Sequence, residues 1–448
     1  MIAARMPRSC KLNPFQQVMA LWEEVRPYNF AHVIRLRGPA NPVLLHESIR
    51  TACQVAGVGK LVLDREGRRY FYEPAESVQL CEMKSEDSRL ERFWRTIADE
   101  INRAFPAEPH HPVRWLVRDD PSSGSHHLVA IYRHLVADFA SSCLLLRRIL
   151  NRYYRMPTGD EKPLVVHPPD YSRVMRRHYW RRDFPTTFLQ AVRRYLRLRH
   201  VYRLPELRDA GEGWQLHVLE APHGLIRRLL AASIRRRVTV NEAFLGALCA
   251  ALAEVTPHRR HHSHRRGLAL AHMVNVRGEA REDLSNCFGV YLRESVTIID
   301  EPDAEDFEVL LGRIVAEVRR ERAERRFGGL DWNFLVLARL RKWHLMKNTV
   351  AWYQKVYPLA AGLSNVRLSA SWFTGISDRI LDSISIVPPG PALPFVLFPT
   401  TVDDKLNLSF VYRESSFTQP EALKLIELFV KKLELFASSG RTGSRGLA

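Results

Sequence analysis

Several features typical of particular protein classes are absent from this sequence of 448 residues. Its six cysteines form no C-x-x-C pair, which favours reduced thiols packed in the core. No segment reaches the roughly 18 uninterrupted apolar residues of a membrane span. The best apolar runs, Ala243–Val255 and Ile384–Val402, are respectively too short and broken by prolines. Residues 1–14 contain no apolar stretch of signal-peptide length. These absences predict a cytoplasmic protein.

Acidic residues are the scarce class of charge, with 49 Asp and Glu against 67 Lys and Arg. The formal net charge of +18 predicts an anionic partner without saying which one. Hydrophobic residues make up 46% and charged residues 26% of the chain, which excludes collagenous, low-complexity and wholly disordered classes. At about 150 residues per domain, the chain is long enough for two or three domains. We therefore expect a packed body of the size of an enzyme.

The first 165 residues interleave predicted strands and helices. Strands are predicted at Asn29–Leu36, in a hairpin at Leu61–Glu73, and at Val113–Asp119 and His127–Val136, and helices at Pro42–Val55 and Arg89–Phe105. Asp138 begins a further amphipathic helix, and its short side chain is well suited to cap the helix N-terminus. We predict that residues 1–165 form an N-terminal lobe.

Residues 166–210 are rich in proline and arginine, and we predict that they form a connecting segment. Residues 211–448 then return to mixed strands and helices and are predicted to form a C-terminal lobe. Its strands are predicted at Trp214–Leu219, Leu268–Val276 and Tyr291–Ile298 and near Ser383 and Leu406, and its helices at Gly224–Arg236, from Val240, at Ala304–Arg326 and at Glu421–Phe436. The two halves have comparable α+β content.

The segment Leu128–Ile149 carries the most suggestive motif and reads LVAIYRHLVADFASSCLLLRRI. An apolar strand ends in His134, and three residues later Asp138 opens a helix. The spacing H-x-x-x-D is weak by itself. With 18 histidines in the chain, about one such spacing is expected by chance.

Further blocks accompany this motif in order along nearly the whole chain. They are NFAHVIRLRGPANPVLLHESI from Asn29, HPVRWLVRDD before HHLVAIYRHLVAD, VTVNEAFLGALCAAL at 238–252, LALAHMVNVR with SNCFG at 268–289, and GLSNVRLS at 362–369. In this order they resemble the condensation-domain superfamily of chloramphenicol-acetyltransferase-like acyltransferases. That superfamily includes nonribosomal peptide condensation domains and wax ester synthases.

The resemblance implies an α/β (α+β) fold in which two chloramphenicol-acetyltransferase-like lobes form a pseudo-dimer with a channel between them. It also implies no tightly bound cofactor, with acyl-CoA or acyl-phosphopantetheine as co-substrate. Two positions depart from the motif of the family. Arg133 stands where the family most often has its first His, and Phe139 stands where it has Gly. Both are candidates to line the channel, and the bulk of Phe139 argues against a long donor.

His134 is the candidate general base for transfer of an acyl group from a thioester to a hydroxyl or amine. Imidazole has an ordinary pKa near 6.5, and a positioned base contributes roughly 100- to 10,000-fold to the rate. Arg133 and the general positive field would favour the neutral imidazole. The alternative is a hydrogen-bonded core histidine at the end of a strand.

By resemblance, Asp138 forms an ion pair with Arg277 that locks the loop of His134 against the second half. Breaking such a buried pair costs about 3–5 kcal/mol, whereas a plain helix cap is worth about 1 kcal/mol. Ser364 and Asn365 are the candidates for binding the oxyanion or positioning the substrate. Asn286 and Gly289 are expected to shape a turn.

Other reactive residue types are expected to be structural. Cys287 lacks the local signature of a thiol nucleophile, so we expect a packed thiol. His258 and His262 have a spacing at which two histidines can bind a metal, but arginines flank them, and we expect a solvated basic loop at 258–266 and no metal. Trp332, Trp343 and Trp352 have core-like spacing, with a channel-lining role as the alternative.

The arginines from Arg173 to Arg203 are mixed with aromatic residues, which suits a helix lying on an anionic surface. An acidic acyl carrier protein or the phosphates of CoA would fit an acyltransferase, and the anionic face of the inner membrane would fit a lipid acceptor. No recognisable nucleic-acid-binding module accompanies the charge, so nucleic acid is not the expected partner. A solvated basic helix is the alternative.

The sequence therefore predicts a free-standing acyltransferase of secondary or lipid metabolism. It would move an acyl group from a CoA or carrier-protein thioester to a small-molecule, sugar or lipid acceptor. The alternative is a catalytically silent scaffold or binding protein that kept the lobes and lost turnover, and Phe139 is its best support.

Overall fold

The computed structural model describes residues 9–64, 66, 68–83, 90–156, 163–166, 184–205, 213–303, 306–325, 355–391 and 393–438. The first part of the chain contains β1 (Cys10–Lys11), α1 (Pro14–Glu23), β2 (Asn29–Arg37), α2 (Pro42–Ala56), β3 (Lys60–Asp64), β4 (Arg69–Glu73), β5 (Leu80–Glu82), α3 (Leu90–Asn102), β6 (Val113–Asp120), β7 (Ser125–Arg133) and α4 (Phe139–Tyr153). The helices and strands predicted before residue 154 are found within a few residues of their predicted bounds.

The second part contains α6 (Phe184–Leu198), β8 (Trp214–Glu220), α7 (Leu225–Arg236), α8 (Val240–Val255), β9 (Leu268–Asn275), β10 (Leu292–Ile299), α9 (Phe307–Arg325), β11 (Ala361–Leu363), β12 (Val366–Leu368), β13 (Ile380–Ile386), β14 (Phe395–Val402), β15 (Lys405–Arg413) and α12 (Gln419–Ser438). Strands β11, β12 and β14 were not predicted from the sequence.

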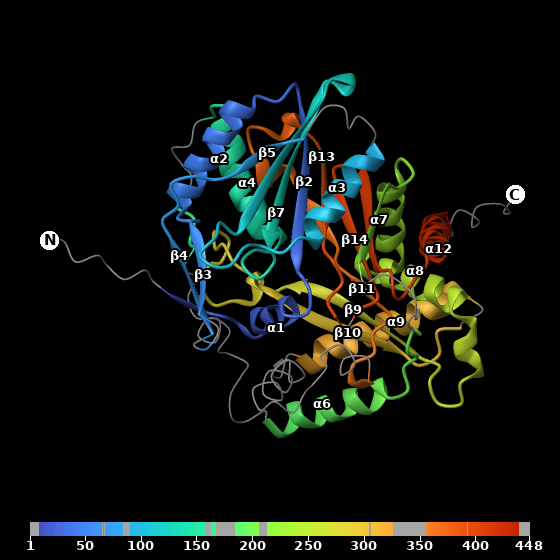
Figure 1. Ribbon diagram of the computed structural model, residues 1–448. Coiled ribbons are helices and arrows are strands. Elements are labelled where there is room, and N and C mark those ends of the chain that lie inside the picture. The colour runs from blue at the N-terminus through green and yellow to red at the C-terminus, as the bar shows by residue number, and fades with distance from the viewer. Residues whose placement is uncertain are drawn as a thin grey trace, which may run out of the picture.

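Two large sheets organise the described residues into two lobes (Figure 1). One sheet has the strand order β13-β2-β7-β6-β5, and the other has the order β10-β9-β11-β14-β15-β8, with β12 paired to β14. A small sheet of order β1-β4-β3 flanks the first lobe. The mixed α/β fold with two lobes that the sequence predicts is confirmed.

Strand β2 is buried on both faces of its sheet. Phe30 and Ile34 belong to the core on the side of α2 and α4, whereas Ala31 and Val33 pack with residues of α3. Because successive side chains of a strand point to opposite faces, burial on both faces requires an almost continuous apolar run. In β2, with the sequence NFAHVIRLR, the apolar residues Phe30, Ala31, Val33 and Ile34 supply both faces, and the buried His32 interrupts them.

Strand β13 joins the two lobes, and the predicted division at residue 210 does not anticipate this. It comes from the second half of the chain, yet it pairs antiparallel with β2 in the sheet of the first lobe. Side chains of the second sheet bind it as well: Asn407 donates to Asp382 at 2.5 Å and the Ser409 hydroxyl donates to the carbonyl of Ser385 at 2.5 Å. The second half of the chain therefore completes the first lobe.

Helix α8 is the central helix of the second lobe. Thr239 caps it, and Glu242 reaches back to the backbone N–H of Thr239, which is a capping box and agrees with the predicted Thr-capped start. Its apolar side chains pack in a core shared with α7, α9 and α12. Among the described residues no single helix meets the length and hydropathy of a membrane span, although α7 and α8 pass together as a pair bent by 102°.

Strand β14 was not predicted because it contains Pro399, and proline normally interrupts a central strand. On one side, β14 pairs in parallel with β11 through Val396 and Leu397, and then with β12 from Thr400 onward. Pro399 lies level with the gap between β11 and β12, so its missing N–H falls where the neighbouring ladder is interrupted. Ser364 and Asn365 occupy this gap.

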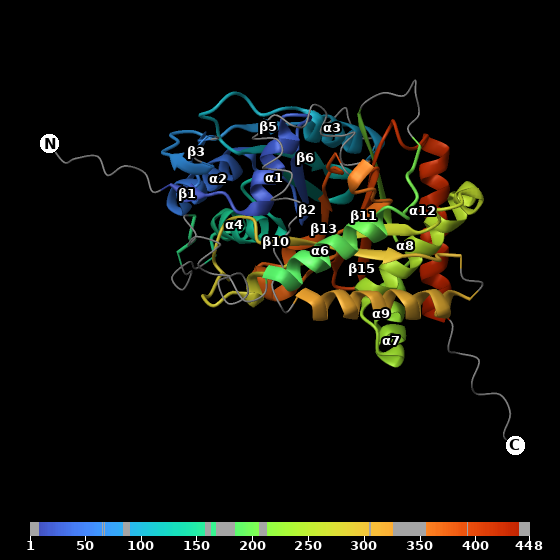
Figure 2. The same cartoon turned by 90° about the horizontal axis from the view of Figure 1, so that it is seen from below.

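Some arginines of helix α6 form ion pairs with acidic residues of the same protein. Arg194 pairs with Glu321 at 2.7 Å and Arg197 with Glu317 at 2.5 Å, and Figure 2 shows α6 lying alongside α9. The loop at 258–266 is mostly exposed, as predicted for a solvated basic loop, except that Arg259 is fully buried and paired with Asp303. Residues 167–183 and 206–212 and the three tryptophans at 332, 343 and 352 lie outside the described residues.

The six cysteines are all free thiols. Five are buried, as predicted for core thiols, but Cys81 is exposed because it lies in the edge strand β5. The part of the chain that the structure describes contains no group of three His, Cys, Asp or Glu side chains that could hold a metal ion.

Candidate active site

His134 follows the last residue of β7 and has a defined tautomer. Its Nδ1 lies 2.9 Å from the carbonyl oxygen of Ala137. A carbonyl can only accept, so Nδ1 carries the hydrogen and Nε2 keeps its lone pair. The ring stacks on Tyr28 with centroids 5.2 Å apart, and the backbone N–H of His134 donates to the carbonyl of Tyr28 at 3.1 Å.

Burial lowers the pKa of His134 below its ordinary value of 6.5, although the Ala137 carbonyl and the charge of Asp138 oppose this effect. The imidazole is therefore neutral at pH 7. Arg133 does not face the imidazole as expected: it pairs with Glu23 at 2.8 Å and with Glu108 at 2.6 Å. The two carboxylates neutralise the charge of Arg133 within this buried cluster. Burial of the imidazole, and not the charge of Arg133, therefore keeps His134 neutral.

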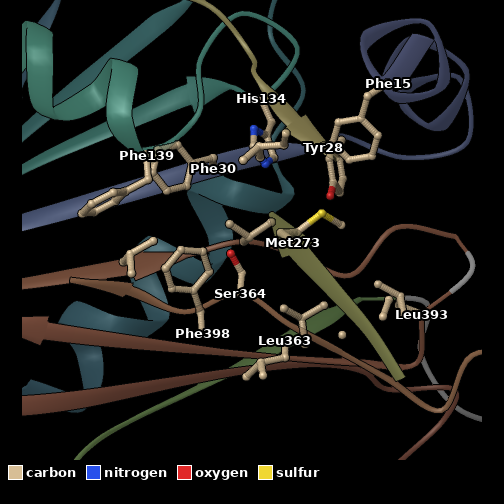
Figure 3. A pocket seen from close by; sticks show the side chains of 16 residues that line it. Phe15, Tyr28, Phe30, His134, Phe139, Met273, Leu363, Ser364, Leu393 and Phe398 are labelled. Atoms are coloured by element: carbon tan, nitrogen blue, oxygen red, sulfur yellow. The ribbon is translucent and has the colours of Figure 1, made fainter. Parts of the chain in front are cut away.

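A cavity of about 60 Å³ lies beside His134 between the two lobes (Figure 3). Its walls come from α1, residue 28 and β2, the turn after β7 with the start of α4, β9, β10, the β11–β12 region, residues 387 and 393, and β14. The lining residues are Phe15, Tyr28, Phe30, His134, Phe139, Ala271, Met273, Leu292, Gly362, Leu363, Ser364, Val366, Val387, Leu393, Val396 and Phe398. The cavity lies where the lobes meet, and the predicted passage from it to the surface stays a prediction.

The polar side-chain groups of this lining are the His134 ring, the Tyr28 hydroxyl and the Ser364 hydroxyl. In Figure 3 the two hydroxyls point into the cavity from opposite walls, with a ring nitrogen of His134 above them. The rest of the lining is apolar. Polar groups placed in such surroundings interact more strongly than they would in water.

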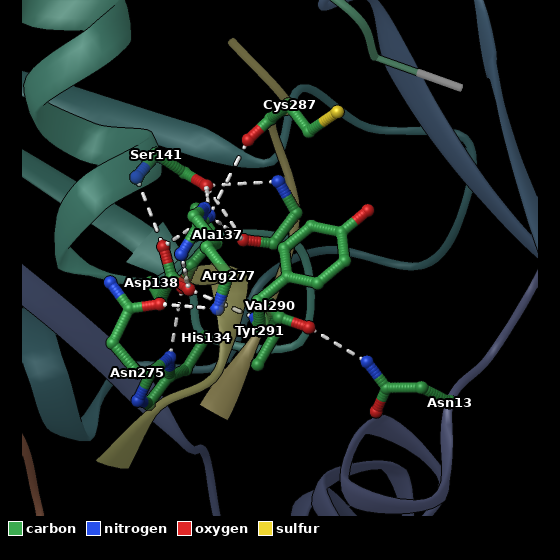
Figure 4. A network of polar contacts seen from close by, with 11 residues as sticks. Asn13, His134, Ala137, Asp138, Ser141, Asn275, Arg277, Cys287, Val290 and Tyr291 are labelled. Atoms are coloured by element: carbon green, nitrogen blue, oxygen red, sulfur yellow. Dashed lines mark hydrogen bonds and ion pairs between the residues drawn. The ribbon is translucent and has the colours of Figure 1, made fainter. Parts of the chain in front are cut away.

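Asp138 is both a helix cap and an ion-pair partner (Figure 4). Its carboxylate accepts the backbone N–H of Ser141 at 3.0 Å, which caps α4. Arg277 donates two further bonds, at 2.6 and 2.9 Å, and the backbone N–H of Tyr291 donates a fourth at 2.9 Å. Asp138 therefore has both of the roles that the sequence analysis gave as alternatives, namely helix cap and ion-pair partner.

Four donors keep the buried Asp138 ionised. Burial by itself would raise its pKa, but the charge of Arg277 and the hydrogen bonds from Arg277, Tyr291 and Ser141 outweigh burial and hold the pKa below the ordinary value of 3.8. Arg277 also donates to the Ser141 hydroxyl at 2.9 Å and lies over the Tyr291 ring at 4.8 Å. The pair thus connects α4 with both ends of the loop from 277 to 291.

Helix α1 supports the same region from the other side. The Gln16 side chain donates to the carbonyl of Leu135 at 2.8 Å, and that of Asn13 donates to the carbonyl of Val290 at 2.7 Å. Asn13 and Gln16 also form a capping box. The motif Asn13-Pro14-x-Gln16 is a helix-start signal that sequence reasoning could have used.

The remaining site candidates divide between the cavity and the scaffold. Phe139 and Ser364 line the cavity, whereas Arg133 and Asn365 are not among the lining residues. Arg133 lies outside because two carboxylates hold its guanidinium on the far side of β7. Cys287 is buried, burial raises its pKa, and it does not line the cavity.

Tyr28 is the polar residue that sequence reasoning missed. It precedes β2, where no periodicity marks it, and its contact with His134 depends on the antiparallel pairing of β2 with β7. Met273 and Phe398 were missed for a related reason, because the far wall of the cavity depends on how distant strands pair. The local sequence carries no signal for such contacts.

Sequence comparisons give no match for this chain, either to a family model or to a curated protein. Solved structures do match. A nonribosomal peptide synthetase bound to alpha-methyl-L-serine-AMP superposes with a TM-score of 0.70 at 15% identity, covering 97% of this chain and 45% of the synthetase. This chain therefore spans less than half the length of that protein.

Two single domains match over nearly their whole length. The first condensation domain of the CDA synthetase gives a TM-score of 0.67 at 16% identity, covering 96% of this chain and 97% of that domain. The X-domain from teicoplanin biosynthesis, in a complex with OxyB, gives 0.61 at 15% identity over 98% of this chain and 95% of the matched chain. The protein has the fold of condensation domains.

The buried pair can be tested through stability. Asp138→Ala leaves Arg277 without its partner inside the protein, so we expect a loss of about 3–5 kcal/mol in the free energy of unfolding. The matched control is Glu279→Ala, because Glu279 pairs with Arg293 at the surface, where such a pair is worth less than about 1 kcal/mol. Urea denaturation measures both. A loss of about 1 kcal/mol for Asp138→Ala would reduce Asp138 to a helix cap.

Proposed function

We propose that the protein is an acyltransferase that moves an acyl group from a thioester to a hydroxyl or amine, with His134 as general base. One observation carries this proposal: a neutral imidazole, fixed by the Ala137 carbonyl, lies on a cavity built by both lobes. The condensation-domain fold supports it. Two lobes that meet at one base suit a reaction that joins two substrates.

The reaction balances with the groups at hand. Nε2 of His134 takes the proton of the acceptor hydroxyl or amine while the acceptor attacks the thioester carbonyl. The tetrahedral intermediate then collapses, the C–S bond breaks, and the imidazolium returns the proton to the departing thiolate. The products are the ester or amide and the free thiol, and His134 ends in its starting form.

The Tyr28 and Ser364 hydroxyls are the proposed donors to the oxyanion of the tetrahedral intermediate. Ser364 was expected in this role, whereas Asn365 is outside the lining. Burial raises the pKa of Tyr28 above its ordinary value of 10, so the hydroxyl keeps its hydrogen. Donors held in an apolar cavity stabilise a developing charge more strongly than donors in water.

The donor in this proposal is acyl-CoA or an acyl group on the phosphopantetheine arm of an acidic acyl carrier protein. The acceptor is a small molecule, a sugar or a lipid. The chemistry needs neither a metal nor a tightly bound cofactor, because the thioester supplies the driving force and the protein supplies a base and positioning. Basic residues at the surface would attract the phosphates of either donor.

A binding protein without turnover is the second candidate. Phe139 lines one side of the cavity, and the free space is small. The X-domain, which has the same fold, was solved in a complex with another protein, OxyB. Activity measurements separate the two candidates.

Replacement of His134 tests the base. We expect His134→Ala to slow thiol release from the best donor by roughly 100- to 10,000-fold, measured with a thiol reagent over a panel of acyl-CoA and acyl-carrier donors. His223→Ala, at an exposed histidine, is the control and should retain full activity. Release that is equal in wild type and His134→Ala contradicts the proposal, and absence of release from every donor favours the binding protein.

The pH dependence of kcat/KM follows from the lowered pKa of His134. The neutral form is the base, so activity is lost as the ring gains a proton. Because the pKa lies below 6.5, we expect the midpoint of the decline in kcat/KM to lie below pH 6.5. A midpoint at or above 6.5 would mean that the catalytic base is a different group or lies in a more exposed site.

Loss of either oxyanion donor should lower kcat. We expect Tyr28→Phe and Ser364→Ala each to lower kcat by roughly 100- to 1,000-fold, the typical effect of removing one such donor, with KM changed much less. Steady-state kinetics on the best donor measures this. A variant that raises KM and leaves kcat unchanged would assign that hydroxyl to substrate binding.

A further inference from the structure

Phe139 lines one side of the cavity beside His134 (Figure 3). It is the first residue of α4, directly after Asp138, and its ring lies 5.0 Å from the His32 ring and 6.4 Å from the Trp372 ring. Trp372 is partly buried in the short helix at 370–373. Beyond Phe139 the wall therefore continues into a second large side chain, and truncation of Phe139 would extend the cavity toward Trp372.

The ring of Phe139 lies next to His32, whose own side chain is held in place. His32 is fully buried between the hydroxyls of Ser142 and Ser383, at 2.8 Å from each, and burial lowers its pKa to about 3. It is thus a neutral ring held at both nitrogens. The backbone of Phe139 is held too, because Asp138 caps the helix at this point.

The free space is small and its walls are mostly carbon. A cavity of about 150 Å³ holds a ligand of the size of benzene, so a cavity of about 60 Å³ has room for only a few carbon atoms. Phe30, Met273, Leu363 and Phe398 line it together with Phe139. This volume suits a short aliphatic chain, and it does not suit a ring or a long acyl chain.

We propose that this cavity is the acyl subsite and that Phe139 sets its length, so that the donor carries a short acyl group of fewer than about six carbon atoms. The inference rests on the proposed acyl transfer and adds its substrate class. The carbonyl carbon lies by His134, Tyr28 and Ser364, and the chain extends toward Phe139. Phe139 is a specificity-determining residue that touches the end of the chain.

The experiment compares chain-length profiles. Wild type, Phe139→Ala and Phe139→Leu are assayed for thiol release from saturated acyl-CoA donors of two to twelve carbon atoms with one acceptor. In wild type we expect kcat/KM to fall at least tenfold between butanoyl and octanoyl donors. Phe139→Ala should move this fall to longer chains by several carbon atoms, and Phe139→Leu should move it less.

Phe105→Ala is the matched control, because Phe105 stacks on His110 and lies outside the cavity lining. Its profile should equal that of wild type. A wild-type profile without a length limit, or a limit that Phe139→Ala leaves in place, overturns the inference. His134→Ala should slow release by a similar factor for every chain length, so loss of the base and change of length specificity remain distinguishable.

Binding separates this inference from the proposed function. Calorimetry with acyl-CoA analogues that carry a non-cleavable thioether in place of the thioester requires no turnover. A length limit in binding that Phe139→Ala relieves supports the subsite even in a protein that releases no thiol, in which case only acyl transfer fails. Binding that is independent of chain length in both proteins overturns the subsite.

Discussion

The buried ion pair between Asp138 and Arg277 is the interaction on which the site depends. Removing two charges from water is costly, and the cost is offset only where geometry and further hydrogen bonds are good. Here the carboxylate receives four donated bonds from three segments of the chain. The pair fixes the start of α4, and with it His134 on one side and Phe139 on the other. A contact between lobes thereby helps to position both His134, the proposed base, and Phe139.

Arg133 illustrates how a substituted motif position can become structural. A guanidinium buried beside a catalytic imidazole would oppose its protonation, but Glu23 and Glu108 neutralise the charge of Arg133 and turn it away from the cavity. Glu23 is the last residue of α1, whose Phe15 lines the cavity and whose Gln16 holds the loop after His134. The arginine therefore anchors a helix that forms one wall of the cavity.

Sequence reasoning reached the features that local signals or ordered motifs carry. The cap at Asp138 and the capping box of α8 follow from residue type and spacing, and the partnership with Arg277 came from the resemblance. The pairing of β13 with β2, the strand β14 with its proline, and the contact of Tyr28 with His134 were missed. Each depends on segments far apart in the chain, and one of them joins residues 29–37 to residues 380–386. Free energies of packing and pairing decide such contacts, and no short window of sequence records them.

The apolar cavity has two opposing effects on the proposed base. Burial lowers the pKa of His134, which keeps the imidazole neutral but also makes it a weaker base. The same shift makes the imidazolium a stronger acid, and a thiolate, whose conjugate thiol has a pKa near 8.5, is easily protonated by it. An alkoxide leaving group would need far more help, and a thiolate needs little. The lowered pKa of His134 is therefore compatible with the proposed thioester donor, because a thiolate is protonated readily, but it does not select a thioester over an ester.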